Sequence, residues 1–380
     1  MTRLIIAGGG LAGCLTALAL AGRPDLQILL VEAQATFGGN HTWSFFDTDV
    51  DPADRWLVKE LVEFHWSDHE VHFPRRSRRI DIGYNSLTSA GLDRTVRSRL
   101  RADQYRLDAS ICEVAVDHVI VAGGERLEAD AVIDARGGTK AEGLDLCWQK
   151  FVGQIFDFGG SHRISRPVIM DATVEQHDGY RFLYFLPLSR SRLLIEDTYY
   201  SSSSALDVAL IEERIQIAAR KLNAGSFDVK AQETGILPVV LDGDFDRFWP
   251  ADDKVARLGV GGGYFHPTTS YSLPDAVANA AWLAELPDFA PEALASLTRS
   301  RAEQLWNDRS FYRLLNRLLF RAAAPDRSYQ VLEHFYRLPQ EVIARFYSAR
   351  LTALDKLRIL SGKPPVPIGR ALLAMRRTAA

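Results

Sequence analysis

The chain opens with two apolar runs that are separated by an Ala- and Leu-rich segment. Residues Leu4–Ala7 form a short apolar run and residues 27–31 form a second one, and each predicts a buried strand. The residues between them, from about 11 to 22, include no charge until the run ends and have the length and spacing of a helix. This order of strand, helix and strand is typical of the units that build parallel sheets.

The hydrophobic pattern changes twice along the rest of the chain. Strands are predicted at 116–121, 131–134, 167–172, 180–186, 192–199, 234–241 and 255–263. Helices are predicted at 205–221 and from about Leu273, and 291–380 has helical spacing nearly throughout. We therefore expect an α/β fold with three parts: a discontinuous parallel-sheet domain of 1–150 and 250–290, an inserted antiparallel-sheet domain of 151–249, and a helical region of 291–380.

Glycines between the first strand and the first helix predict a bound dinucleotide. Gly8 makes the tight turn, Gly10 lets the backbone approach a pyrophosphate, and Gly13 lets helix and strand pack closely. The helix N-terminus, with Leu11 and Ala12 in its first turn, offers free N–H groups to the phosphates. An acidic residue, Glu32, follows the second strand and can accept a hydrogen bond from a ribose 2′-OH.

Composition narrows the class of protein. The first 22 residues approach the length of a membrane span or a secretory signal, but glycines interrupt the run, so we expect neither. The chain has 380 residues, is 47% hydrophobic and 24% charged, and has a net charge of −3, which is typical of a soluble globular protein without a nucleic-acid partner. Its three cysteines have no metal-ligand spacing, so we expect no metal site and a reducing cytoplasm.

Three further glycine-rich segments extend the candidate cofactor site. In flavoproteins with two dinucleotide-binding domains, an acid followed by a Gly-Gly loop carries FAD, and here Glu32 is followed by Gly38-Gly39. We therefore expect the parallel-sheet domain to be a Rossmann-like FAD-binding domain of that type. The segments that follow the predicted strands 131–134 and 255–263 are further candidates, because a parallel sheet places its ligand crevice at the ends of its strands. Surface turns and plain strand exits remain the alternative interpretation. The predicted cofactor contacts in these segments are Gly38, Gly39, Asn40, His41, Asp134, Gly137, Gly261, Gly263, His266, Pro267 and Thr268.

Two adjacent acids, Glu196 and Asp197, stand in an apolar strand and are the candidate catalytic residues. Strand geometry sends their side chains to opposite faces, so one can enter a buried site while the other serves the far surface. Burial disfavours the charged form of a carboxyl and raises its pKa, which suits a general acid. A strand end with two solvated carboxylates is the alternative.

Seven segments taken together resemble the bacterial lycopene β-cyclase family of carotenoid biosynthesis. They run in order along nearly the whole chain, and the Asn-His-Thr-Trp-Ser-Phe, Ile-Glu-Asp and His-Pro-Thr-Thr segments are the most specific. One departure is Ser270, where the family commonly has Gly. The matching segments are residues 38–45, 169–174, 179–182, 193–198, 265–269, 315–317 and 359–365.

The resemblance implies a redox-neutral, acid-catalysed cyclisation of the ψ ends of lycopene to β-ionone rings, giving β-carotene through γ-carotene. It also implies FAD in its reduced form, with NADPH or NADH as the reductant. Glu196 matches the family's essential acid, and Asp197 would position it. Aromatic residues are candidates for lining a polyene tunnel, in competition with core packing, namely Trp43, Phe45, Tyr180, Phe182, Tyr184 and Phe265.

The expected partners are lycopene and γ-carotene, a membrane surface that supplies them, and other carotenoid enzymes, with the protein in the cytoplasm and peripherally bound to the membrane. A membrane role would fit the Arg- and Leu-rich helical region and the basic run of residues 75–79. A flavin-dependent monooxygenase or reductase acting on an isoprenoid shares the cofactor fold and stays open as an alternative. So does a carotenoid carrier that has lost catalysis.

Overall fold

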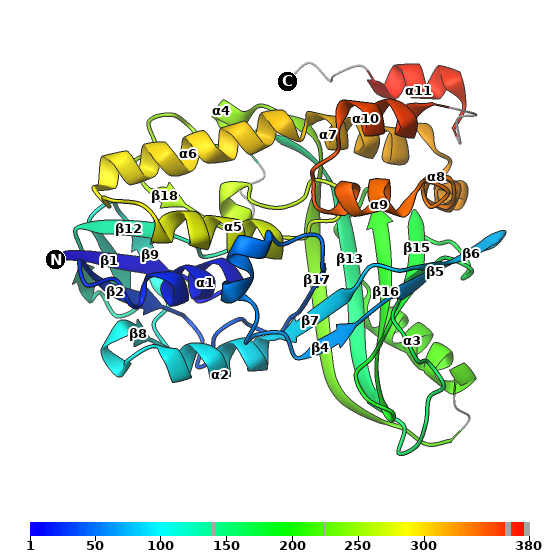
Figure 1. Ribbon diagram of the computed structural model, residues 1–380, viewed down its shortest axis with the longest axis horizontal. Coiled ribbons are helices and arrows are strands. Elements are labelled where there is room, and N and C mark those ends of the chain that lie inside the picture. The colour runs from blue at the N-terminus through cyan, green and yellow to red at the C-terminus, as the bar shows by residue number, and fades with distance from the viewer. Residues whose placement is uncertain (139–141, 223–224, 362–365, 376–380) are drawn as a thin grey trace.

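A five-stranded parallel sheet forms one half of the molecule in the computed structural model, which describes residues 1–138, 142–222, 225–361 and 366–375 (Figure 1). Its strand order is β18-β12-β1-β2-β8. Helices α1 (Leu11–Leu20) and α5 (Leu273–Ala284) pack against each other beside this sheet. The strands are β1 (Thr2–Ala7), β2 (Leu26–Val31), β8 (Tyr105–Arg106), β12 (Ala131–Asp134) and β18 (Ala256–Arg257).

The parallel register brings the ends of the three central strands together. Ala7 pairs with Val31 on one side and with Asp134 on the other, so the segments that follow these residues leave the sheet at the same edge. The predicted strand of 255–263 is much shorter than expected. It pairs over only two residues, because Gly259 and Gly263 adopt φ angles of 63° and 78° and turn the backbone out of the sheet.

A seven-stranded, mostly antiparallel sheet forms the other half, in the order β17-β13-β16-β15-β14-β5-β6. Helix α3 (Val208–Leu222) covers one face, where Ile211 and Ile215 pack on Val152 and Ile195 in a common core. The opposite face, called the inner face below, looks toward the parallel-sheet domain and the helical region. The strands are β5 (His69–Phe73), β6 (Arg76–Ile80), β13 (Leu144–Asp157), β14 (Val168–Asp171), β15 (Tyr180–Pro187), β16 (Arg192–Ser201) and β17 (Asp228–Gly243).

Residues 42–88 contain strands that sequence analysis did not find. They form the small sheet β3-β7-β4 and add β5 and β6 to the edge of the large sheet, although sequence analysis assigned them to the cofactor domain. The basic run of 75–79 lies on the β5–β6 hairpin and is tied to the protein: Arg75 pairs with Glu333, and Arg78 donates to backbone carbonyls near α8. The small-sheet strands are β3 (Thr42–Phe46), β4 (Phe64–Trp66) and β7 (Tyr84–Thr88).

The helical region confirms the predicted helical spacing after residue 291. Most of its helices lie over the top of the large sheet and share a core with the inner face that includes Tyr180, Tyr200, Tyr336 and Phe346. Helix α6 instead packs beside β18 and belongs to the core of the parallel-sheet domain. Residues 362–365, part of the last resembling segment, and 376–377 lie outside the described residues. The helices are α6 (Pro291–Asp308), α7 (Ser310–Arg317), a π-helical turn (Leu318–Ala322), α8 (Tyr329–Phe335), α9 (Gln340–Tyr347), α10 (Ala353–Leu360) and α11 (Ile368–Met375).

Three shorter strands and two helices complete the parallel-sheet domain. A small antiparallel sheet of order β11-β10-β9 packs beside the parallel sheet, in a core that joins Val119 and Val121 to Ile5 and Val132. Among the described residues, no helix is long and apolar enough to cross a membrane. The remaining elements are α2 (Ser89–Arg99), β9 (Ile111–Val114), β10 (His118–Val121), β11 (Arg126–Glu128) and α4 (Phe245–Phe248).

Candidate functional site

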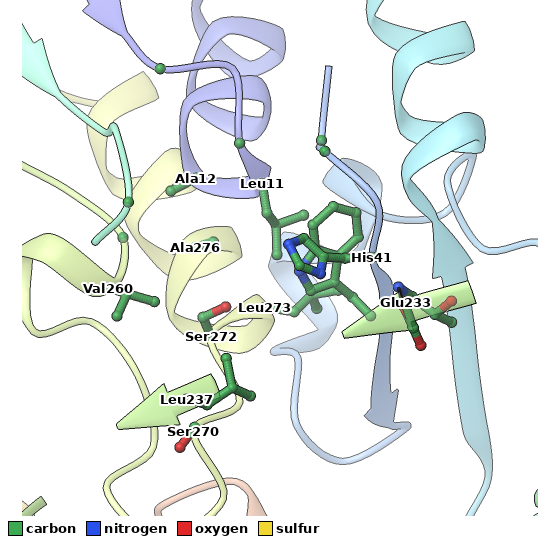
Figure 2. A pocket seen from close by; sticks show the side chains of 18 of the residues that line it. Leu11, Ala12, His41, Glu233, Leu237, Val260, Ser270, Ser272, Leu273 and Ala276 are labelled. Atoms are coloured by element: carbon green, nitrogen blue, oxygen red, sulfur yellow. Dashed lines mark hydrogen bonds between the residues drawn. The ribbon is translucent and has the colours of Figure 1, made fainter. Parts of the chain in front are cut away.

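A cavity of about 560 Å³ lies where the carboxyl edge of the parallel sheet meets the inner face of the large sheet. Residues after β1, β2 and β12 line one end, and side chains from β13, β15, β16 and β17 line the other. Figure 2 shows Glu233 and Leu237 of β17 on one side of this space, with Leu11 and Ala12 of α1 across from them. Its volume is in the usual range for small-molecule and cofactor sites.

The first glycine loop has the geometry that a dinucleotide site requires. A Cβ at Gly13 would lie 2.0 Å from the carbonyl oxygen of Gly8, and a Cβ at Gly8 would lie 2.6 Å from the Cα of Arg136. These two glycines therefore permit close packing between helix and strand. A Cβ at Gly10 would meet no atom within 4 Å, and Gly10 lines the cavity, so its backbone is open to a ligand at the N-terminus of α1.

Glu32 lines the same end of the cavity, as a ribose-binding acid should. Its two carboxylate oxygens accept hydrogen bonds from the backbone N–H of Gly9 at 2.7 Å and of Gln34 at 2.9 Å. These bonds hold the carboxylate beside the glycine loop. Each oxygen has a second lone pair, which is free to accept a hydroxyl.

Only some of the residues predicted in the second glycine loop and after β12 line the cavity. Gly38, Gly39, His41 and Gly137 line the cavity. Asn40 does not: its side-chain amide donates to the carbonyl of Gln232 at 2.5 Å and ties the loop to β17. Likewise Gly13 supports the loop from behind, and Asp134 forms an ion pair with Arg136 at 2.8 Å instead of facing the cavity.

The segment of residues 261–268 is placed differently from the prediction. Gly261, Gly263, His266, Pro267 and Thr268 do not line the cavity. The imidazole of His266 is buried, contacts the carbonyl of Phe346 at 2.9 Å and accepts from the N–H of Thr268 at 3.1 Å. Burial lowers the pKa of His266 to about 3, so this is a neutral histidine that braces the turn.

The cofactor side of the cavity is formed by the residues just before and after this turn. They include Val260, Ser270, Ser272, Leu273 and Ala276, which surround the space in Figure 2. The physical reason is that the glycines of the turn fold residues 261–268 behind the cavity wall. The predicted strand exit therefore reaches the cavity, but the residues that line the cavity lie just outside the predicted segment of 261–268.

Ser270 occupies a backbone conformation that glycine adopts more readily than serine. Its φ angle is 58°, which is in the left-handed region that disfavours residues with a Cβ. The Ser270 hydroxyl donates to the buried carbonyl of Pro238 at 2.6 Å. This hydrogen bond offsets part of the strain and anchors the turn to β17, so the departure leaves the cavity wall in place.

Glu196 and Asp197 point to opposite faces of β16, as predicted. Glu196 lines the cavity on the inner face, and its carboxylate accepts a hydrogen bond from the Thr198 hydroxyl at 2.5 Å. Burial and the nearby carboxylate of Glu233 raise the pKa of Glu196 well above its ordinary value. A carboxyl in this setting keeps its proton at neutral pH and can act as a general acid.

Asp197 does not reach the cavity, so it does not touch a ligand there. Its side chain is fully buried beneath α3 and forms a two-pronged ion pair with Arg181, with N···O distances of 2.8 Å. The Tyr199 hydroxyl also donates to it, at 3.0 Å. Asp197 therefore ties β16 to β15 on the face opposite Glu196, and its predicted role of positioning Glu196 stays a prediction.

Sequence analysis missed a second acid, Glu233 of β17. Its side chain lines the cavity, is 7% exposed, and accepts a hydrogen bond from the backbone N–H of Thr42 at 2.7 Å. Burial raises the pKa of Glu233. The predicted strand began at residue 234, so Glu233 fell just outside it. Alternation back from Leu237 through Gly235 would have placed Glu233 on the inner face.

Aromatic side chains form part of the apolar wall near these acids. Of the residues predicted for a polyene tunnel, Trp43 and Tyr184 line the cavity, and Tyr84 and Tyr271 join them. The hydroxyl of Tyr84 is hydrogen-bonded to Tyr184 and contacts that of Tyr271 at 3.3 Å. The other predicted members lie in the core and do not line it, namely Phe45, Tyr180, Phe182 and Phe265. Among the described residues, no cluster of His, Cys, Asp and Glu could hold a metal ion.

Comparison with known proteins gives one family over nearly the whole chain. The family model described as "Lycopene cyclase protein" matches residues 3–373. The chain is 41% identical to a lycopene beta-cyclase of Pantoea ananas, over 99% of this chain and 98% of that protein. It is 44% identical to a lycopene beta-cyclase of Paracoccus sp. (strain N81106 / MBIC 01143), over 97% and 96% respectively.

Solved structures show the same fold at low identity. A flavin-dependent brominase matches with a TM-score of 0.65 and 12% identity, covering 94% of this chain and 97% of that one. A geranylgeranyl bacteriochlorophyll reductase-like protein from Thermoplasma acidophilum matches with a TM-score of 0.62 and 13% identity, covering 96% of each chain. These matches establish a Rossmann-like flavoprotein fold.

Proposed function

This chain belongs to the lycopene cyclase family, and we propose that it converts the linear ψ ends of lycopene to β-ionone rings, giving β-carotene through γ-carotene. One observation carries the proposal: the buried carboxyl of Glu196, whose pKa is raised by burial and by the nearby Glu233, stands in the same cavity as an open glycine loop of the dinucleotide-binding type. A cyclisation without net redox change needs a proton donor in a largely apolar site, and the inner face supplies one.

The residues around the cavity fit FAD. Gly10 and the N-terminus of α1 would hold the pyrophosphate, Glu32 the adenosine ribose, and the Gly38-Gly39 loop with residues 270–273 the flavin half. Reduced flavin, when bound, supplies negative charge close to a developing carbocation. NADPH or NADH as the source of its electrons is part of the same proposal.

The proposed chemistry starts with the proton of Glu196. It passes to C2 of the terminal double bond of lycopene, the O–H bond breaks, and a tertiary cation is left at C1. The electrons of the C5–C6 double bond then close the ring, which moves the cation to C5, and loss of the C6 proton completes the β-ring. Trp43 and Tyr184 line the cavity, and a cation over the π face of either ring would be favoured by roughly 0.5–2 kcal/mol.

The first experiment mixes the purified protein, FAD, excess NADPH and liposomal lycopene without oxygen and separates the pigments by chromatography. We expect β-carotene to form with no stoichiometric loss of NADPH, since the ring closure consumes no electrons. Consumption of NADPH in step with product would instead identify a monooxygenase or reductase acting on an isoprenoid. Lycopene that is bound but never cyclised would identify a carrier.

We further propose that the protein binds the cytoplasmic face of an anionic membrane through α10 and α11, and takes its water-insoluble substrate from there. The two helices lie together at the outer edge of the helical region (Figure 1). They expose Leu354, Leu357, Ile368, Leu372 and Leu373 by 61–67% each. Residues 351–380 contain six Lys or Arg and one acid, in a chain whose net charge is −3. An apolar helical surface with basic flanks fits anionic lipid.

Flotation with anionic liposomes tests this surface. Wild-type protein is expected to float with the vesicles, and the double variant Leu357→Gln/Leu372→Gln to partition at least about tenfold less, because each leucine forfeits roughly 1–2 kcal/mol of apolar transfer. The matched control, Leu210→Gln/Ile217→Gln, changes two exposed residues of α3 and should float like wild type. Equal flotation of all three proteins would exclude α10 and α11 as the membrane contact.

A further inference from the structure

Glu196 and Glu233 stand on either side of β13, at the position where β13 carries only a glycine. In the register of the large sheet, Gly153 of β13 pairs with Glu196 of β16 on one side and with Glu233 of β17 on the other. Cross-strand neighbours on the same face of a sheet project together. Glu196 and Glu233 both line the cavity, so their side chains extend into the same space above Gly153.

The absent side chain at residue 153 leaves this space to the carboxyl groups. A Cβ built on Gly153 would lie 3.3 Å from Cγ and 3.4 Å from Oε1 of Glu233. It would also lie 3.4 Å from a methyl group of Leu194, the residue two positions before Glu196. Even an alanine at 153 would require the Glu233 side chain to shift by a few tenths of an ångström. The glycine therefore keeps the gap between the acids open.

Each carboxylate has one fixed hydrogen-bond donor. The Thr198 hydroxyl donates to Glu196, and the backbone N–H of Thr42 donates to Glu233. These bonds orient one oxygen of each group from opposite sides. Burial raises the pKa of both carboxyls, and the charge of Glu233 raises that of Glu196 further.

The other titratable groups near the pair are uncharged, lie behind the sheet or, like Glu32 and Arg136, line the glycine-loop end of the cavity. Burial keeps the pKa of the Tyr184 and Tyr200 phenols above the ordinary value, and it lowers the pKa of His41 on the loop before β3. These groups are therefore neutral near pH 7. Asp197 faces the other side of β16, where Arg181 pairs with it.

We propose that Glu196 and Glu233 act as one acid–base pair that shares a single proton across Gly153. This inference rests on the proposed cyclisation. Glu196 gives the proton to C2 of the substrate, so its O–H bond breaks and a C–H bond forms. The two carboxylates that remain face each other in a buried site, and their repulsion makes the pair a strong base. When the C6–H bond breaks, the pair takes up that proton, and one turnover returns it to its starting state.

The key variant is Glu233→Gln, which keeps the shape of the side chain and removes its charge. We expect turnover of lycopene to fall by about 10–100-fold, which is less than the roughly 10²–10⁴-fold that loss of a general acid or base usually costs, because Glu196 keeps its carboxyl. The alkaline limb of the pH profile should also move to lower pH, by about one unit or more. The sign follows because the negative charge of Glu233 disfavours ionisation of Glu196, and its removal lets Glu196 lose its proton at lower pH.

The control is Asp228→Asn, an exposed carboxylate at the start of the same strand. It should leave both turnover and the alkaline limb unchanged. Gly153→Ala keeps both acids and is expected to displace Glu233, so it should shift the alkaline limb in the same direction as Glu233→Gln. A role for Glu233 in folding alone would lower stability without moving that limb.

A second readout needs no substrate. Infrared difference titration of the FAD-loaded protein should show a protonated carboxyl that is lost above neutral pH and is absent in Glu196→Gln, and Glu233→Gln should move that loss to lower pH. An unchanged titration in Glu233→Gln would overturn the proton-sharing pair. If wild-type protein titrates as described but forms no ring, the proposed cyclisation fails and the pair stands.

Discussion

Glu196→Gln is expected to lower the turnover of lycopene by about a thousand-fold or more, within the range for loss of a general acid in an enclosed site. The amide has the size of the carboxyl but no acidic proton. It can still accept the hydrogen bond from Thr198 that holds the native side chain at 2.5 Å, so the cavity should keep its shape. The measurement is ring formation under anaerobic conditions, together with FAD affinity, which should stay within about twofold.

The matched control for this variant is Glu175→Gln. Glu175 belongs to the same half of the molecule, and its side chain is 81% exposed, so its change should leave turnover at the wild-type level. Activity of Glu196→Gln within tenfold of wild type would remove Glu196 as the proton donor. Loss of FAD together with activity would instead show that the substitution damaged the cofactor site.

Asp197→Asn is expected to lower the free energy of unfolding by about 3–5 kcal/mol, because it leaves the buried guanidinium of Arg181 without its counter-charge. The side chains of Arg181 and Asp197 are 8% and 0% exposed, so water cannot replace the lost carboxylate. Urea unfolding followed by circular dichroism measures the change. Cyclase activity per folded molecule should fall much less than in Glu196→Gln.

The double variant Arg181→Met/Asp197→Leu removes both charges together. It therefore measures the net contribution of the ion pair to the free energy of unfolding, apart from the cost of one buried charge without a partner. Burial raises the pKa of Asp197 despite the neighbouring Arg181, so desolvation of the carboxylate outweighs its attraction to the cation. An apolar pair of similar volume should therefore recover most of the loss. A free energy of unfolding for Asp197→Asn within 1 kcal/mol of wild type would contradict the structural role.

The cofactor half of the fold could be predicted because its sequence signals are local. The glycines, the helix and Glu32 all fall within the first 32 residues, and their spacing alone determines a strand-helix-strand unit. The strands of residues 42–88 escaped because they are only three to five residues long and mix apolar with polar residues. Arg75 and Arg78 look like a solvated loop until Glu333 and the end of α8, about 260 residues later, are brought against them.

In the candidate site, too, the sequence predicts local features but not contacts between residues that are far apart in the chain. Glu196 could be found from its own strand, since an acid inside an apolar run needs no partner to be noticed. Glu233 could not be connected to it, because their common neighbour, Gly153, is set by a three-strand register that only the folded sheet shows. His266 stands in a specific motif, but its hydrogen-bond partner is the carbonyl of Phe346, 80 residues away in the sequence. The residues near His266 therefore do not show whether it supports the turn or contacts a cofactor.

The order of strands in the parallel sheet has a consequence for how this chain is made. β1 lies at the centre, yet its neighbour β12 comes more than a hundred residues later, and β18 and α5 later still. The first 32 residues cannot bury their apolar surface until about residue 284 has left the ribosome. The chain therefore has a high contact order, which slows folding and leaves the nascent glycine-loop unit exposed to chaperones and aggregation throughout most of its synthesis.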